Sequence, residues 1–595
     1  MIVRSTAALA LTLTLLSAPA YAETPDVFHT PARTFSGAFL AAAAARNDND
    51  FGVAARYYDE ALRFDPSNDG LKQELMVSLL TDGQFENALI YARDLQSSLA
   101  AERVARLAVG VDLIRSGQFD EAQTALLIAN QNDLERLLSA IMRGWAGAGL
   151  GSAEAAIDAI VDLSGPSWFD IFQTYHAALI AEAGGNIARA KSLFEDGMND
   201  TAGSRASPLT YIRMASAYAT LLAAEGATTE AQAVLERGLA LAPTNPLLLA
   251  GATAIAEGET LTREAMSPAQ GTAEILLNLG SAINREGAEA FAALYLEMAR
   301  AAWPEEPQVL FELGSTAERL DQVEKAIEYY ADVASASPLH RLAALQQGLA
   351  LSDLDRNDEA KATLTALIDE SPEDFRGYMA LGGVHSFLKE WAEAASIYEK
   401  ALENIDADDP RYWTVHYRLG ISYERQKLWE QAEPAFLKAL ELSPDQPDVL
   451  NYLGYSWIDM NMNLERGLEM IETAVRQRPR DGYIVDSLGW AHYRLGNFED
   501  AVIELEKATN LRPRDPTIND HLGDAYWRVG RKLEAVHHWS RVLDMESEDV
   551  DFDKVRAKVD AANSSDMNPD IASSIVDDQA SGVASDSNES ESNGG

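Results

Sequence analysis

The sequence predicts an all-α solenoid, in which pairs of helices stack one on another along the chain. Glycines recur at steps of mostly 34 residues through the second half of the chain: Gly280, Gly314, Gly348, Gly382, Gly420, Gly454, Gly489 and Gly523. A small residue follows each of them after twelve or thirteen positions: Ala292, Ala326, Ala360, Ala394, Ala432, Gly467, Ala501 and Ala535. This period indicates one helix pair per repeat, and a pair that cannot bury its apolar face alone must stack.

The spacing inside one repeat supports helices. In WEQAEPAFLKALEL, residues 429–442, apolar residues recur at steps of three and four, which places them on one helical face. Small residues at fixed points let two helices cross closely. Prolines end the second helix in most repeats, about twelve residues beyond the small position: Pro304, Pro338, Pro372, Pro444, Pro479 and Pro513.

The first half of the chain carries a weaker copy of the ladder. Its small position recurs at the same step of 34 and then after a longer one: Ala54, Ala88, Ala122, Ala156, Ala190 and Ala231. The ladder then loses register, and AEGETLTREAMSPAQGT, residues 256–272, is polar and contains Gly, Ser and Pro. We therefore expect a degenerate array over 23–255, a joint at 256–272 and a second array over 273–547.

The pattern is clearest in HYRLGISYERQKLWEQAEPAFLKALELSP, residues 416–444. This stretch resembles the tetratricopeptide repeat (TPR) family, and the resemblance extends from about residue 36 to 547. The matching positions are Leu419, Gly420, Tyr423, Ala432, Phe436, Ala439 and Pro444. The resemblance implies a right-handed superhelix of helix pairs whose first helices line a concave groove for protein partners.

Both ends of the chain differ from the repeats. Residues 1–22 combine Arg4, an apolar run and a small-x-small ending, so we expect a secretory signal cleaved after Ala22 and a periplasmic protein. The chain has no cysteine, so we expect neither disulfides nor a lipoprotein anchor. At the other end, residues 548–595 are acidic, and from Ser564 no basic residue occurs. We expect a mostly disordered tail there.

The formal net charge of −45 makes nucleic acid and anionic membranes unfavourable partners, because both carry phosphate charge. Basic or neutral protein partners suit the chain better, although a salt-adapted host would produce the same acidic bias. No later stretch is long and apolar enough for membrane insertion. The oligomeric state stays open.

Candidate catalytic and metal-binding motifs all have structural interpretations. Ser487 lies in DSLGW, but Val485 stands where a hydrolase elbow needs glycine. The DLDRNDEA stretch from Asp353 lacks the turn glycine of a calcium loop. His537 and His538 are adjacent, so their side chains point about 100° apart on a helix. We therefore expect no catalytic residue, no cofactor and no metal site.

What remains is a protein-binding groove, placed by the TPR resemblance three residues before, one after, and four or five after each repeat glycine. The expected groove residues in the second array are Phe387, Tyr417, Ile421, Arg425, Asn451, Tyr455, Asp486, Trp490, Tyr493, Arg494, Asp520, Asp524, Trp527 and Arg528. Aromatic residues and arginine often dominate binding energy at interfaces. The alternative is that some of these rings fill the space between repeats.

The stretches NYLGYSWIDMNMNLERGLEMI and RPRDGYIVDSLGWAHYRLG, together with DPTINDHLGDAYWRVGRKLEA, resemble the ending of exported bacterial TPR proteins. That resemblance implies a scaffold or adaptor in the cell envelope, including one that presents substrates to a processing protease. Two alternatives stay open. One is an assembly factor for outer-membrane or polysaccharide-export machinery, and the other is an enzyme with an unrecognised site in the N-terminal half.

Overall fold

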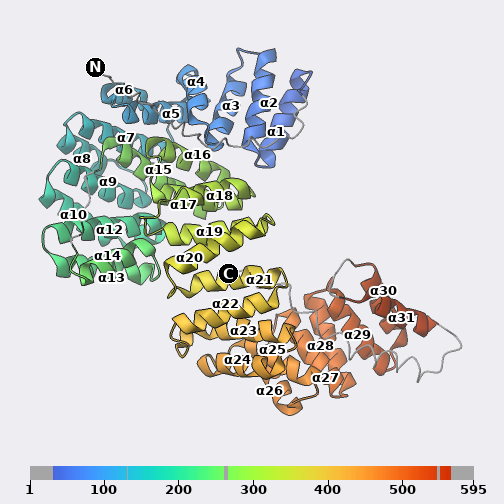
Figure 1. The fold of residues 1–595 in the computed structure, drawn as a ribbon. Coiled ribbons are helices and arrows are strands. Elements are labelled where there is room, and N and C mark those ends of the chain that lie inside the picture. The colour runs from blue at the N-terminus through green and yellow to red at the C-terminus, as the bar shows by residue number, and fades with distance from the viewer. Residues whose placement is uncertain are drawn as a thin grey trace, which may run out of the picture. The chain divides into compact units, whose positions relative to one another are not determined.

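The predicted all-α solenoid is confirmed. The computed structural model describes residues 31–98, 100–129, 131–259, 261, 266–545 and 550–563, and every regular element within these ranges is a helix (Figure 1). The chain forms two compact units, one ending at His340 and the other beginning at Arg341. The predicted signal at 1–22 and the tail from 564 lie outside the described residues.

The helices follow the predicted alternation of first and second helices. In the first unit the first helices are α1 (Phe35–Asn47), α3 (Asp69–Thr81), α5 (Glu102–Arg115), α7 (Asp133–Gly149), α9 (Asp170–Ala183), α12 (Pro208–Ala224), α14 (Pro246–Ala256), α15 (Pro268–Arg285) and α17 (Pro307–Arg319). The second helices are α2 (Phe51–Phe64), α4 (Phe85–Leu95), α6 (Phe119–Ala125), α8 (Ala153–Val161), α10 (Ile187–Met198), α13 (Thr228–Leu241), α16 (Glu289–Ala302) and α18 (Val323–Ala331). Two short helical segments, η1 (Ser167–Phe169) and α11 (Thr201–Ala206), flank α9 and α10.

The second unit continues the alternation. Its first helices are α19 (His340–Asp353), α21 (Phe375–Phe387), α23 (Trp413–Arg425), α25 (Pro447–Asp459), α27 (Gly482–Arg494) and α29 (Pro516–Arg528). Its second helices are α20 (Asn357–Glu370), α22 (Trp391–Asn404), α24 (Trp429–Leu442), α26 (Leu464–Gln477), α28 (Phe498–Leu511) and α30 (Lys532–Leu543). A short helix, η2 (Pro410–Tyr412), precedes α23, and α31 (Phe552–Asn563) follows α30.

The repeat glycine is required by the crossing of the two helices in a pair. A Cβ placed on Gly420 would lie 2.7 Å from a ring carbon of Phe436, and one on Gly523 would lie 2.4 Å from the Trp539 ring. Both rings stand four residues after the small position of their repeat. The recurring glycines therefore mark the same close contact between the two helices of each pair, repeated along the chain.

The polar joint interrupts a repeat but does not separate the two compact units. Helix α14 ends normally, with Gly258 at φ 76. The small position, five residues after the equivalent glycine in the neighbouring repeats, is Arg263 here. The sequence here therefore lacks the small residue of a close helix crossing. Among the described residues, the next helix in chain order is α15, a first helix.

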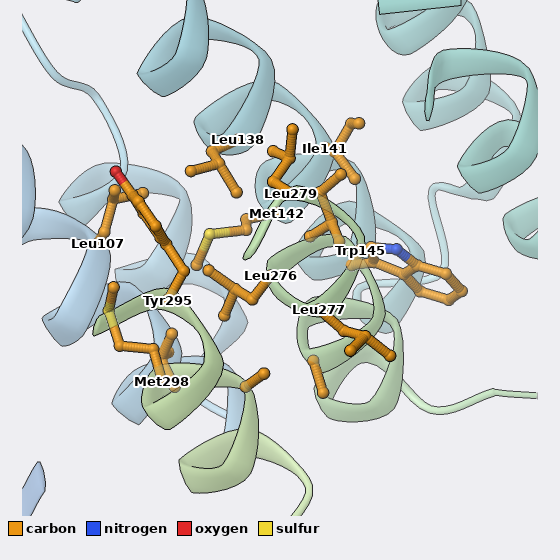
Figure 2. Close-up of a cluster of buried hydrophobic side chains, with 14 of the residues drawn as sticks. Leu107, Leu138, Ile141, Met142, Trp145, Leu276, Leu277, Leu279, Tyr295 and Met298 are labelled. Atoms are coloured by element: carbon orange, nitrogen blue, oxygen red, sulfur yellow. The ribbon is translucent and has the colours of Figure 1, made fainter. Parts of the chain in front are cut away.

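Helices α15 and α16 fold back onto the first helices of the first unit, which the sequence did not predict. They pack against α3, α5, α7 and α9. Figure 2 shows the shared core, where Leu276 and Leu279 of α15 lie among Leu138, Ile141 and Met142 of α7. Residues 268–340 therefore belong to the first compact unit, and the predicted start of the second array at 273 is wrong as a domain boundary.

The ordered chain also extends past the predicted end of the repeats at 547. Helix α31 packs against α30, and Val555 is 1 % exposed. Its apolar residues Val555, Val559 and Ala562 recur at steps of three and four, the signal of an amphipathic helix. Because the surrounding stretch is acidic, its composition predicted disorder instead of a helix. The predicted start of the disordered tail, residue 548, is therefore too early.

Among the described residues, no helix is long and apolar enough to cross a bilayer.

Candidate protein-binding surface

The first helices α3, α5, α7 and α9 of the first unit are covered by the protein's own helices α15 and α16. Besides the apolar core, a buried polar cluster fixes α15 in place. The guanidinium of Arg213, on α12, donates to Glu274 of α15 at 2.6 Å and lies 3.1 Å from Glu306. The hydroxyl of Tyr175, on α9, donates to Glu274 at 3.0 Å. Because Glu274 is fully buried, its pairing with Arg213 helps to fix the register of α15 against α9 and α12.

A second buried polar contact ties α7 to α9 beside this cluster. The indole Nε1 of Trp145 donates to Nδ1 of His176 at 3.1 Å. Complete burial lowers the pKa of His176 to about 4, so the ring is neutral near pH 7 and accepts this hydrogen bond. His176 therefore serves as a buried packing residue between α7 and α9.

In the second unit, half of the predicted groove residues are buried between repeats. They are Asn451, Asp486, Trp490, Tyr493, Asp520, Asp524 and Trp527. The cause is that α25, α27 and α29 pack directly against one another. Trp490 is 2 % exposed and stacks on His521 of the next repeat, with ring centroids 4.0 Å apart. The expectation that these seven side chains line an open surface is wrong.

The other predicted residues stay partly accessible, and Phe387 is the most exposed. The half-buried ones are Tyr417, Ile421, Arg425, Tyr455, Arg494 and Arg528. Their arginines contact groups of the chain itself: Arg494 pairs with Asp459 at 2.6 Å, and Arg528 lies 4.1 Å over the Phe498 ring. Phe387, at the end of α21, is 68 % exposed. Whether these residues bind a partner stays a prediction.

Leucine and methionine at the same register positions of α19 and α21 extend this accessible face. We call the Phe387 surface the set Leu345, Leu349, Met379, Phe387, Tyr417, Ile421 and Tyr455. Leu349 is 38 % exposed, and the others apart from Phe387 are half-buried. Leu345, Leu349 and Met379 were absent from the predicted groove, although the glycine register of Gly348 and Gly382 identifies them.

The buried aspartates of α27 and α29 form an ion cluster with residues from neighbouring helices. Nδ1 of His521 lies 3.0 Å from Asp486. The ammonium of Lys558, on α31, donates to Asp520 at 2.9 Å and to Asp524 at 2.7 Å. Lys558 was missed because it lies in the stretch predicted as tail. These acids therefore serve packing between helices.

The cluster contains three acids, Asp486, Asp520 and Asp524, and two bases, His521 and Lys558. This excess of acid affects the pKa values of its members. Burial raises the pKa of Asp524 from 3.8 to about 7, and the Asp520 charge adds to the effect while Lys558 opposes it. Burial works against the charged form of Lys558, but the two carboxylates outweigh it and raise the lysine pKa. Likewise Asp486 outweighs burial and raises the pKa of His521.

We expect α31 to be held more firmly at about pH 5.5 than at about pH 8. An acid with a raised pKa favours folding when protonated, so this contribution falls as pH rises from about 4 through about 7. The raised pKa of His521 acts in the same direction on the packing of α29 against α27, where His521 contacts Asp486. Amide protection factors in α31, corrected for the intrinsic exchange rate, measure the difference, and Asp524→Asn should reduce it. Equal protection at both pH values would contradict this prediction.

The motifs with possible chemistry occupy packing positions. Ser487 is 5 % exposed, and its hydroxyl donates to the carbonyl of Tyr483 at 3.1 Å, as a serine inside a helix often does. His538 contacts Asn519 at 2.9 Å. Within the described ranges, no group of three or more His, Asp or Glu side chains is placed to hold a metal ion.

Comparisons with known proteins agree with the repeat pattern. Tetratricopeptide repeat profiles match residues 290–340, 342–374 and 373–445, and a TPR repeat profile matches 489–530. The chain is 29% identical over 197 residues to the TPR repeat-containing protein PA4667 of Pseudomonas aeruginosa, which is 32% of each chain. It is also 29% identical over 135 residues to the general transcriptional corepressor ssn6 of Schizosaccharomyces pombe, covering 22% of this chain and 12% of the relative. The matched region thus spans a third or less of these relatives.

Solved structures give weaker likenesses. A tetratricopeptide repeat protein from Parabacteroides merdae is 15% identical, with a TM-score of 0.36 over 43% of this chain and 99% of its own. Yeast Tom70 is 13% identical, with a TM-score of 0.32 over 89% of this chain and 95% of its own. Because these TM-scores are low, the assignment rests on the repeats themselves. The four profile matches, the 34-residue ladder and the stacked helix pairs together make this chain a tetratricopeptide repeat protein.

Proposed function

We propose that this protein is a scaffold or adaptor that binds a protein partner on the Phe387 surface. Tetratricopeptide repeats generally mediate protein–protein interactions. The observation that supports this location is the contrast between the two units. In the first unit, α15 and α16 cover the first helices α3, α5, α7 and α9, whereas Phe387 on α21 leaves 68 % of its surface accessible.

The chemistry of the surface favours a particular kind of partner segment. Its exposed side chains are apolar and aromatic, and apolar area is what an interface removes from water. The whole chain carries a formal net charge of −45, and negative charge attracts basic groups over distances of about 10 Å at moderate salt. A polypeptide segment with apolar side chains and flanking lysine or arginine therefore fits best.

We further propose that the protein works in the periplasm, after removal of residues 1–22. The support is the arrangement of Arg4, the apolar run and the small residues before Glu23. Intact-mass measurement of the protein from its native cell should give a chain that begins at Glu23. A chain that retains residues 1–22 would overturn the location. In this compartment the partner would be a cell-envelope protein, such as the substrate of a processing protease or a component of export machinery.

A photocrosslinking amino acid at position 387 should capture a discrete partner in intact cells. Position 503 is the matched control, because Ile503 is 51 % exposed but lies on a second helix, α28. With the captured partner purified, Phe387→Asp should weaken binding by about 30-fold, the effect of losing one interface hot spot of about 2 kcal/mol. The helical signal should not change.

Equal capture at positions 387 and 503, or unchanged affinity of the Phe387→Asp chain, would remove the Phe387 surface as the binding site. The identity of the captured protein separates the adaptor from the alternative, an assembly factor for outer-membrane or polysaccharide-export machinery. Capture of machinery subunits alone would favour the assembly factor.

A further inference from the structure

A cavity lies between the second helices of the first two repeats. Its volume is about 400 Å³, and its lining residues come mainly from α2, α3 and α4. Leu75 and Leu79 of α3 are buried, whereas Ile90 of α4 is 64 % exposed. The cavity therefore combines an apolar floor with an edge that faces solvent.

The cavity is found where α2 has smaller residues than the second helices that follow. Gly52 and Ala55 line it. At the position of Ala55, in steps of 34 residues, the next four second helices carry larger side chains: Leu89, Gln123, Ile157 and Lys191. Of these, Leu89 is 1 % exposed. Helix α2 lacks such a side chain, and the space beside Ala55 is open.

The charged residues that line the cavity offset one another. Arg56 and Arg63 line it together with Asp59 and Glu60. The guanidinium of Arg63 donates to Asp59 at 2.7 Å. Since the lining has no excess of either charge, an apolar side chain that covers the floor is a better occupant than an ion.

The chain passes the wall of the cavity at the point where the described residues begin. The backbone N–H of Ala32 donates to the Glu60 carboxylate at 2.8 Å, and Glu60 lines the cavity. Ala32 is half-buried and packs against the core of the first unit. The residues that precede Pro31 in the chain are therefore tethered beside the cavity.

The sequence of these preceding residues suits the apolar floor. Val27 and Phe28 are the only large apolar side chains in ETPDVFHTP, residues 23–31. Its two prolines disfavour helical backbone in the residues before them, which favours an extended chain. Four extended residues span about 13 Å. Phe28, four residues before Ala32, is therefore within reach of the cavity.

We propose that residues 26–30 of this chain lie in the cavity, with the Phe28 ring against Ala55, Leu75 and Leu79. The segment then forms a strap across α2 and α4. A terminal repeat has a neighbour on one side only, so it opens more easily than an internal one. The strap supplies contacts that the first repeat otherwise lacks. It shares no residue with the Phe387 surface and does not depend on a partner there.

Benzoylphenylalanine at position 28, introduced into the full chain in its native cells, tests the strap. After purification and irradiation, we expect a crosslink within the same chain to residues 84–91, located by mass spectrometry of the digest. Position 39 is the matched control, because Phe39 of α1 is 39 % exposed and its ring lies 6.2 Å from that of Tyr58 on α2. It should crosslink to α2 and give at least tenfold less product with residues 84–91.

Filling the cavity should displace the strap. Ala55→Leu supplies the side chain that Leu89 has in the next repeat, so it should reduce the crosslink from position 28 to residues 84–91 at least tenfold. If Ala55→Leu lowers the helical signal, Ile90→Asp replaces it, because a carboxylate at this exposed edge disfavours the ring without disturbing the core. In the chain without a crosslinker, Phe28→Asp should speed amide exchange in α2 and α4 several-fold and leave α12 unchanged.

Three results would overturn the strap. The first is a crosslink to residues 84–91 that persists in a folded cavity variant, or unchanged exchange in the Phe28→Asp chain. The second is crosslinking of position 28 to a second copy or to another protein instead of to its own chain, which would assign the segment to an interface. The third is the absence of any product from position 28 under conditions in which position 39 reacts.

Discussion

Replacing Trp490 by alanine is expected to lower the local free energy of unfolding around α27 by about 3 to 5 kcal/mol, the usual effect of truncating a buried aromatic ring. The ring is 2 % exposed, stacks on His521 at 4.0 Å and lies 4.8 Å from the Tyr493 ring. Its loss leaves a cavity between two repeats, and neither helix can close the cavity without losing its own crossing. Hydrogen exchange of the α27 and α29 amides measures the effect locally, which suits a repeat protein that does not unfold in one step.

Phe387→Ala is the matched control for this change. Both residues are aromatic and follow a repeat glycine, but Phe387 is 68 % exposed, so its truncation should change stability by less than about 0.5 kcal/mol. The two variants therefore distinguish an aromatic residue that packs between repeats from one that is exposed on a first helix. A Trp490→Ala chain with unchanged amide protection would show that this ring is not packing core.

Arg213→Met should open the first unit, with a loss of about 3 to 5 kcal/mol in the stability of α15 and α16. Methionine keeps much of the side-chain volume but removes the charge. Glu274 and Glu306 then remain buried without their cation, and Glu274 keeps only its neutral donors Tyr175 and Asn278. Faster exchange of α15 and α16 amides, and new protease cleavage in these helices, report the opening.

Arg189→Met provides the control for Arg213→Met. Arg189 also contacts two carboxylates, Glu154 and Asp158, but their side chains are 58 % and 63 % exposed. Water replaces the lost contact at such a site, so the change should be below about 1 kcal/mol. If the two variants behave alike, the polar cluster of Arg213 does not hold α15 in place.

Several features were predictable because they depend on contacts between close neighbours in the chain. The ring four residues after the small position, as in Phe436 after Ala432, meets the repeat glycine of the same pair, Gly420. Helix α31 was also predictable, since Val555, Val559 and Ala562 have helical spacing, although the acidic composition of residues 548–595 favours disorder. The burial of Trp490 was not predictable, because Trp490 and Ile421 hold the same register position and only the approach of the next first helix distinguishes them.

The sequence by itself determined the helix pairs and their order along the chain, because a 34-residue period repeats one local contact many times. Only the tertiary structure decided which first-helix faces are covered. Arg213 meets Glu274 across 61 residues, and Arg300 donates to the Gly83 carbonyl across 217. Each of these contacts occurs once in the chain, so no repeated sequence pattern reveals it. They arise because α15 and α16 bury their apolar faces in a core shared with α7, far from them in the sequence.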